Sequence, residues 1–232
     1  MRIPPALPVT LMALFSLDAL AVEPKNLKDV DISAMTQDTQ VMANAEGIHL
    51  VWWIPPEYWE ASLLSDKDMS ESDRNAFLTI MKKYSMLAIA QADLSRFGTV
   101  SFYDRDTITK GMTIEFSDGK NKRAIKPVEK VPDELGLLLK VMTPMLEGAL
   151  GNTGKNLQFF VLDDQDKDGR IISPYVQSTL TVLLKEKDGT AVEPVVIELP
   201  VNSLFVPRMC PNGKPAHVSW VVCPWDGSKL PK

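Results

Sequence analysis

The Asp-Gly dipeptides at residues 118–119, 168–169 and 188–189 constrain the fold of this chain more than any other feature. They lie near runs rich in valine, isoleucine, threonine and phenylalanine, which are residues that favour strands. Asp-Gly is a preferred pair in tight hairpin turns, because glycine adopts a positive φ at little cost. Since a hairpin joins antiparallel neighbours, the chain is predicted to build most of its sheet from antiparallel strands.

Segments with strand character occur along most of the chain, at residues 48–54, 86–93, 99–103, 112–116, 157–162, 178–184 and 192–199. Two principal helices interrupt them, at about residues 70–84 and 132–150, and a shorter helix is expected near 33–45. In the first principal helix, apolar side chains recur every three or four residues, at Phe77, Ile80, Met81 and Tyr84. This order predicts an α+β fold with a mainly antiparallel β-sheet.

The first 21 residues predict a secretory signal peptide. Arg2 provides the positive start, residues 9–17 the apolar run, and Ala19-Leu20-Ala21 a small-x-small cleavage site. The run is too short to cross a bilayer, which takes roughly twenty apolar residues. The mature protein is expected to be residues 22–232, one α+β domain with a cysteine-containing tail, residues 206–232, packed on it. Its expected location is periplasmic or secreted, with no transmembrane span.

The formal net charge of the chain is −5. Nucleic acids attract proteins through a basic surface, so no nucleic-acid partner is expected. One basic cluster lies beside the turn at residues 118–119 and is interpreted as the solvated end of a hairpin. Its members are Lys120, Lys122, Arg123 and Lys126.

The only two cysteines, Cys210 and Cys223, both lie in the tail. An exported protein meets an oxidising environment, in which an even pair of cysteines is most simply a disulfide. A bridge between them would close a loop of about 14 residues and stabilise the chain end by about 3 kcal/mol in the chain-entropy model. The sequence therefore predicts a disulfide-clipped C-terminal tail.

The segments Cys210-Pro-Asn-Gly213 and Cys223-Pro-Trp-Asp-Gly227 resemble the paired Cys-Pro-x-Cys-Gly knuckles of zinc-ribbon and rubredoxin-like proteins. In those families each knuckle supplies two thiolates to one tetrahedral metal site. Here Gly213 and Asp226 stand where the second cysteines would be. The resemblance makes zinc an alternative to the disulfide, and free thiols are a third alternative. The four mixed zinc ligands would be Cys210, His217, Cys223 and Asp226.

Asp164, Asp166, Asp168 and Gly169 resemble the first half of an EF-hand calcium loop. In that family alternating carboxylates surround the cation and glycine makes the sharp turn. This chain departs from the pattern at Tyr175, where the family has a bidentate glutamate. A solvated Asp-Gly hairpin is the favoured interpretation, and a weak calcium site at Asp164, Asp166 and Asp168 is the alternative. No other cofactor is expected.

The densest group of aromatic residues surrounds Pro55-Pro56 and includes two acids, Glu57 and Glu60. Carboxylates beside aromatic rings are typical of sites that hydrolyse sugars, although core packing is the favoured interpretation here. The aromatic residues are Trp52, Trp53, Tyr58 and Trp59. His49, on the preceding strand, is interpreted as a packed or sheet-edge residue.

The sequence has no nucleophile, metalloprotease or phosphate-loop motif, so no catalytic residue is assigned. The favoured interpretation is an exported, non-enzymatic binding or interaction domain whose partner is a protein or a cell-envelope ligand. The alternative is an extracytoplasmic hydrolase that acts on a glycan-like polymer through carboxylates near residues 52–60. An exposed apolar patch would favour the binding domain, and a cleft holding Glu57 or Glu60 beside another acid would favour the hydrolase.

Overall fold

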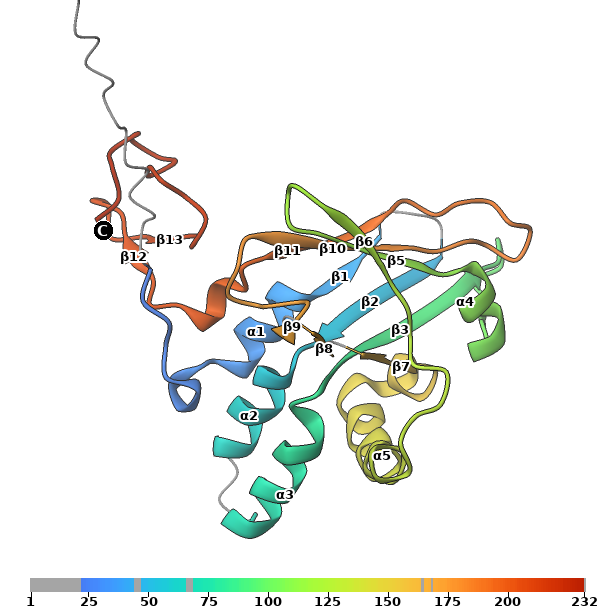
Figure 1. Ribbon diagram of the computed structural model, residues 1–232. Helices are drawn as coiled ribbons and strands as arrows, with labels where there is room; N and C mark the ends of the chain where they lie inside the picture. The colour runs from blue at the N-terminus through green and yellow to red at the C-terminus, as the bar shows by residue number, and fades with distance from the viewer. Residues whose placement is uncertain (1–21, 44–46, 66–68, 164, 168, 232) are drawn as a thin grey trace, which may run out of the picture.

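Strand β3 (Tyr84–Leu94) organises the first sheet of the computed structural model (Figure 1). One edge of β3 pairs with the whole of β2 (Ile48–Ile54), and β1 (Gln40–Met42) continues the sheet beyond β2. The other edge of β3 is shared between β7 (Gln158–Asp163) and β4 (Val100–Phe102). All these pairings are antiparallel, as predicted.

The second sheet has the strand order β11-β10-β5-β6 and is also antiparallel. Its strands are β5 (Thr113–Ser117), β6 (Lys122–Ile125), β10 (Ser178–Leu183) and β11 (Val195–Leu199). The predicted hairpin at residues 118–119 joins β5 to β6, and Gly119 has a φ of +84°. The basic cluster lies at this hairpin, where Lys122 pairs with the Glu115 carboxylate at 2.8 Å.

The two predicted principal helices are confirmed as α3 (Glu71–Met81) and α5 (Asp133–Lys155). Helix α3 is shorter than predicted because residue 84 already begins β3. The other elements are α1 (Ile32–Thr39), α2 (Pro56–Ser65), α4 (Arg105–Gly111), the two-residue strands β8 (Gln165–Asp166) and β9 (Gly169–Arg170), and the 3-10 helices η1 (Leu27–Asp29) and η2 (Asn202–Leu204).

One local prediction was wrong, and one helix was missed. The expected helix at 33–45 ends at Thr39, because the next residues pair with β2 as β1. Helix α4 was not predicted, since its short sequence has little apolar periodicity. It is started by Asp104, whose carboxylate accepts a hydrogen bond from the Thr107 backbone N–H at 2.8 Å.

The structure describes residues 22–43, 47–65, 69–163, 165–167 and 169–231, of which 65, 141–143 and 145–152 are described only by their backbone. The predicted signal peptide, residues 1–21, lies outside the described residues. Among the described helices, none combines the length and the apolar composition that a bilayer crossing requires.

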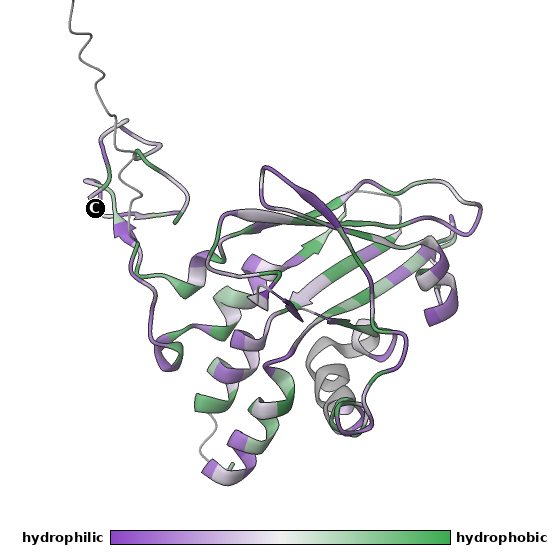
Figure 2. Cartoon of the chain, in the orientation of Figure 1, coloured by the Kyte–Doolittle hydropathy of each residue, from purple (hydrophilic) through white to green (hydrophobic). Residues whose placement is uncertain are grey.

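The first sheet lies between the second sheet and the helices α2, α3 and α5 (Figure 1). Trp53 and Phe160 pair with the same β3 residue, so they share one buried face. On the opposite face, Trp52 Nε1 donates to Thr39 Oγ1 at 3.2 Å, and its ring lies 5.3 Å from the Tyr58 ring. Figure 2 shows the resulting hydrophobic colour along the central strands and hydrophilic colour along β6.

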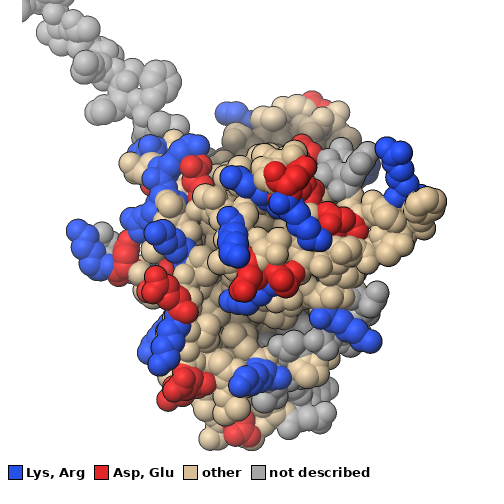
Figure 3. Space-filling view, turned by 90° about the vertical axis from the view of Figure 1, so that its right-hand side faces the viewer, with Lys and Arg blue, Asp and Glu red and all other residues tan. Residues whose placement is uncertain are grey.

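Charged side chains of both signs are interspersed on the face that Figure 3 shows. No single-sign field covers this face, and the small net charge of −5 is spread over the chain. A ligand is therefore not drawn to this face by long-range electrostatic attraction.

Gly47 precedes β2 with a φ of +106°, a conformation that other residues rarely adopt. A Cβ atom there would lie 2.5 Å from the backbone oxygen of Ala92. Gly47→Ala is expected to lower the free energy of unfolding by roughly 2 kcal/mol, measured by urea denaturation. Gly98→Ala is the matched control, because Gly98 also has a positive φ but open space around its Cβ position. Equal losses of unfolding free energy in the two variants would show that contact between the added Cβ atom and the Ala92 oxygen does not destabilise the protein.

Candidate functional site

Glu57 lies in the first turn of α2, and its Oε1 accepts a hydrogen bond from Arg170 Nη1 at 2.5 Å. The Glu57 side chain is only 12% exposed, so this ion pair is largely shielded from water. The aromatic residues around it are packed in the core, as favoured by the sequence: Trp52, Trp53, Tyr58 and Trp59. Glu57 therefore serves as an ion-pair partner that ties α2 to β9.

Strands β8 and β9 pair as a small antiparallel hairpin, and Gly169, the first residue of β9, has a φ of +114°. Asp164 and Asp168 lie outside the described residues. Asp166 Oδ2 lies 2.5 Å from Arg123 Nη1, and this ion pair ties the hairpin to β6. In the described part of the chain, no three His, Cys, Asp or Glu residues are grouped to hold a metal ion. Calcium binding by this hairpin stays a prediction.

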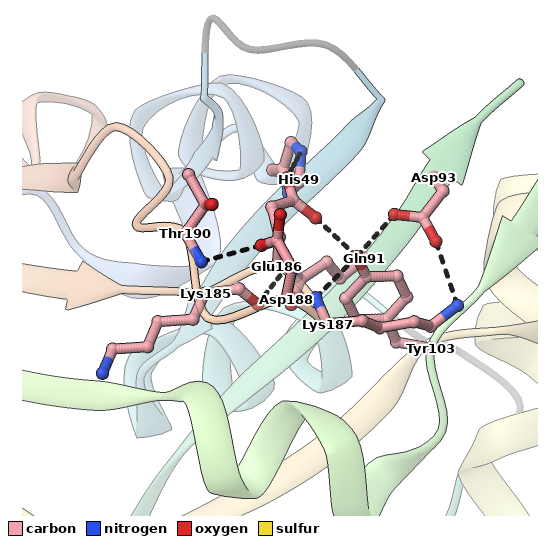
Figure 4. A network of polar contacts seen from close by, with 9 residues as sticks. All are labelled: His49, Gln91, Asp93, Tyr103, Lys185, Glu186, Lys187, Asp188 and Thr190. Atoms are coloured by element: carbon pink, nitrogen blue, oxygen red, sulfur yellow. Dashed lines mark hydrogen bonds and ion pairs between the residues drawn. The ribbon is translucent and has the colours of Figure 1, made fainter.

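A polar network joins the two sheets under the loop between β10 and β11 (Figure 4). His49 of β2 and Gln91 of β3 are cross-strand neighbours, and both are fully buried. Gln91 Nε2 donates to the backbone oxygen of Lys185 at 3.0 Å, and His49 Nε2 lies 3.2 Å from Glu186 Oε1. Because His49 has no exposed surface, it is a packed residue that a substrate does not reach.

Tyr103 connects this interior pair to charged groups nearer the surface (Figure 4). Its Oη lies 2.5 Å from both Asp93 Oδ1 and Glu186 Oε2, while Lys187 Nζ lies 3.0 Å from Asp93 Oδ2. Burial, and then the two carboxylates, raise the pKa of Tyr103 far above its usual range. The hydrogen bond from Tyr103 in turn lowers the pKa of Asp93. These contacts fasten the second sheet to the first, so we interpret the network as structural.

The C-terminal module, residues 207–231, contains β12 (Arg208–Met209) paired with β13 (Pro215–Ala216). Each cysteine begins a tight turn closed by a glycine of positive φ. Gly213 N donates to Cys210 O, and Gly227 N donates to Cys223 O, both at 2.9 Å. Figure 1 shows the module at the side of the molecule next to η2, beyond the end of the second sheet.

The two cysteines lie close together in the small core of this module, which they share with Ala216 and Leu230. Both cysteine side chains are buried. Burial, and then the neighbouring Cys223 thiol, raise the pKa of Cys210 to about 11. A Cys210–Cys223 pair is thus placed for a disulfide, but the bond itself is not present in the structure.

The mixed zinc ligand set is not assembled, since these residues form no group able to hold a metal among the described residues. His217 Nδ1 accepts the Ser219 backbone N–H at 3.2 Å. The neutral imidazole therefore carries its proton on Nε2, where it is a donor. Asp226 Oδ1 accepts hydrogen bonds from the backbone and the hydroxyl of Ser228, at 2.9 and 2.7 Å.

The module presents an exposed group of large side chains, which we call the aromatic surface. The Trp220 ring lies 6.0 Å from the His217 ring and 6.0 Å from the Trp225 ring, and Lys214 Nζ lies 5.0 Å from the centre of the Trp225 ring. Trp220 is 37% exposed and Trp225 49% exposed. The members of the aromatic surface are Lys214, His217, Trp220, Val221, Val222 and Trp225.

The backbone of the aromatic surface is held by groups outside it. The Val218 backbone N–H donates to Asn202 Oδ1 at 2.8 Å, which connects the module to η2. Arg208 Nη2 donates to the backbone oxygens of Val218, at 3.0 Å, and Trp220. The stretch from His217 to Trp220 is therefore positioned by the fold.

A pocket of about 270 Å³ lies between this module and the second sheet, and we call it the junction pocket. Hydroxyl, carboxyl and amide side chains from three strands and from the module contribute to its lining beside apolar surface. The lining residues are Ser117, Asp118, Gly119, Gln177, Ser178, Thr179, Glu198, Leu199, His217 and Ser219. His217 belongs to both the pocket and the aromatic surface, so the two form one continuous site, the junction site.

Comparisons with models of known protein families, with curated protein sequences and with solved structures gave no match. The function is therefore inferred from the geometry of the junction site.

The sequence did not predict the junction site. Two signals were present, the two tryptophans in the tail and the lone His217 between the cysteines. The pocket residues gave no signal, because they come from hairpin and strand segments that are far apart in the chain. Serine, threonine and glutamate on the outer face of a strand are ordinary surface residues until a second element covers them.

Proposed function

We propose that this protein is an exported domain that binds a component of the cell envelope at the junction site and catalyses no reaction of its own. The exposure of Trp220 and Trp225 carries this proposal. The other three tryptophans are buried, as expected for side chains of this size. Two neighbouring exposed tryptophans form the kind of apolar patch that marks a binding surface.

The alternative, a glycan hydrolase acting through Glu57 and Glu60, has less support. Such an enzyme needs one carboxyl group that donates a proton and a second one that activates water or attacks the sugar. Glu57 is instead engaged by Arg170 and is largely shielded from water. Two results together would support the hydrolase. The wild type would release reducing sugar from a polysaccharide, and the Glu57→Gln variant would not.

The disulfide between Cys210 and Cys223 is part of this proposal. Its formation would remove two protons and two electrons from the thiol pair, and a disulfide-bearing oxidoreductase of the exported compartment would accept them by thiol–disulfide exchange. The proximity of the two thiols supports it. The bond would hold the turns on which Lys214 and Trp225 stand, so that less side-chain and backbone freedom is lost when a ligand binds.

The test is co-sedimentation of the purified mature protein with cell envelopes prepared from the organism that produces it. The wild type is expected to pellet with the envelopes. For a Trp220→Ala, Trp225→Ala double variant, the ratio of unbound to bound protein is expected to be roughly tenfold higher. Phe97→Ala is the control, because Phe97 is 97% exposed in the turn after β3, away from the module. A wild type that stays in the supernatant would overturn the proposed function.

A further inference from the structure

The junction site combines two kinds of surface that a single sugar chain would use together. Each sugar ring has a face of C–H groups and an edge of hydroxyl groups. The exposed parts of the Trp220 and Trp225 side chains offer apolar surface to the C–H face. The junction pocket offers hydrogen-bond partners to the hydroxyl edge, and His217 lies where the pocket meets the aromatic surface.

The polar groups of the pocket suit hydroxyl groups in particular. Glu198 accepts hydrogen bonds, Gln177 both donates and accepts, and Thr179 can do either. The Asp118 carboxylate already accepts from the backbone N–H groups of Lys120 and Asn121. His217 adds a donor at Nε2, because its Nδ1 accepts from Ser219. A ligand whose groups are both donors and acceptors can satisfy such a mixed set.

The charge of the pocket argues against anionic ligands. Its ionisable groups are the two carboxylates Asp118 and Glu198, and His217 is the only basic residue in its lining. Phosphate groups of nucleic acids or of acidic lipids would be repelled by the carboxylates. A neutral ligand with many hydroxyl groups meets no such penalty.

We infer that the ligand of the junction site is a neutral saccharide chain of the cell envelope. One sugar ring stacks on a tryptophan of the aromatic surface, and a neighbouring ring places its hydroxyl groups in the junction pocket. Lys214 Nζ lies over the Trp225 ring, 5.0 Å from its centre, so the stacked sugar ring takes Trp220 or the opposite face of Trp225. The inference rests on the proposed function and specifies its ligand.

The test treats the same envelopes in three ways before co-sedimentation. Protease digestion and solvent extraction, which remove proteins and lipids, are expected to leave binding of the wild type unchanged. Periodate, which opens sugar rings at adjacent hydroxyls, is expected to lower the bound fraction roughly tenfold. Soluble oligosaccharides released from the envelopes should compete with the same concentration dependence for wild type and Phe97→Ala.

A second measurement separates sugar recognition from apolar adhesion. Thr179→Val keeps the shape of the side chain but removes its hydroxyl, and is expected to weaken saccharide binding several-fold. An apolar partner would bind this variant and the wild type with equal affinity. Binding that survives periodate but is abolished by protease would overturn the saccharide inference and leave the proposed function standing. No envelope binding at all would overturn both.

Discussion

Protein purified without reductant is expected to contain no titratable thiol, and reduction is expected to destabilise the C-terminal module by about 3 kcal/mol. The module has its own small core around Cys210 and Cys223, separate from the main core. The loss should therefore be local. It would appear as roughly hundredfold faster hydrogen exchange of amides in residues 208–230, because local opening sets their exchange rate.

The Cys210→Ser, Cys223→Ser double variant provides the control, since it should match the reduced wild type with or without reductant. Hydrogen exchange of β3, in the main core, should be the same in all samples. Two free thiols in the oxidised preparation would show that the disulfide is absent. One equivalent of zinc, with thiols that titrate only after chelation, would instead support the zinc alternative.

Replacing Tyr103 by phenylalanine is expected to lower the free energy of unfolding at pH 7 by about 3 kcal/mol. Tyr103 is 3% exposed, and its hydroxyl is the link between Asp93 and Glu186. A hydrogen bond to a charged group contributes about 1.5–3 kcal/mol, and the single Tyr103 proton is shared between the two carboxylates. The variant would also leave Glu186 next to an apolar ring edge. Urea denaturation measures the loss.

Tyr175→Phe is the matched control, because the Tyr175 ring packs on Phe205 and its hydroxyl makes no hydrogen bond within the described residues. Its stability at pH 7 should stay within about 0.5 kcal/mol of the wild type. A similarly small loss for Tyr103→Phe would show that the network contributes little to the attachment of the second sheet.

The effect of Tyr103 should also depend on pH in a defined direction. The pKa of Tyr103 is raised by folding, so the folded protein holds this proton more tightly than the unfolded chain. The stabilisation is complete below the ordinary tyrosine pKa of about 10 and is lost as the pH rises above it. The difference between wild type and Tyr103→Phe should accordingly shrink above pH ~10. A difference that grows there would contradict the assignment.

Local patterns were sufficient to predict most of the fold. The Asp-Gly pair at residues 118–119 and the periodic apolar residues of α3 act over a few neighbours, so the chain itself reveals them. The same reasoning identified the tryptophans around Pro55-Pro56 as core. It failed for β1, because three residues without a strong propensity become a strand only when β2 lies beside them.

The sequence by itself determined the antiparallel α+β class and the two principal helices. These follow from residue type and short-range spacing. Only the tertiary structure decided that His49 meets Glu186, that the cysteines come close together, and that His217 completes a pocket lined by distant strands. The physical reason is separation along the chain. Tyr103 and Glu186 are 83 residues apart, and their contact exists only after two sheets have packed together.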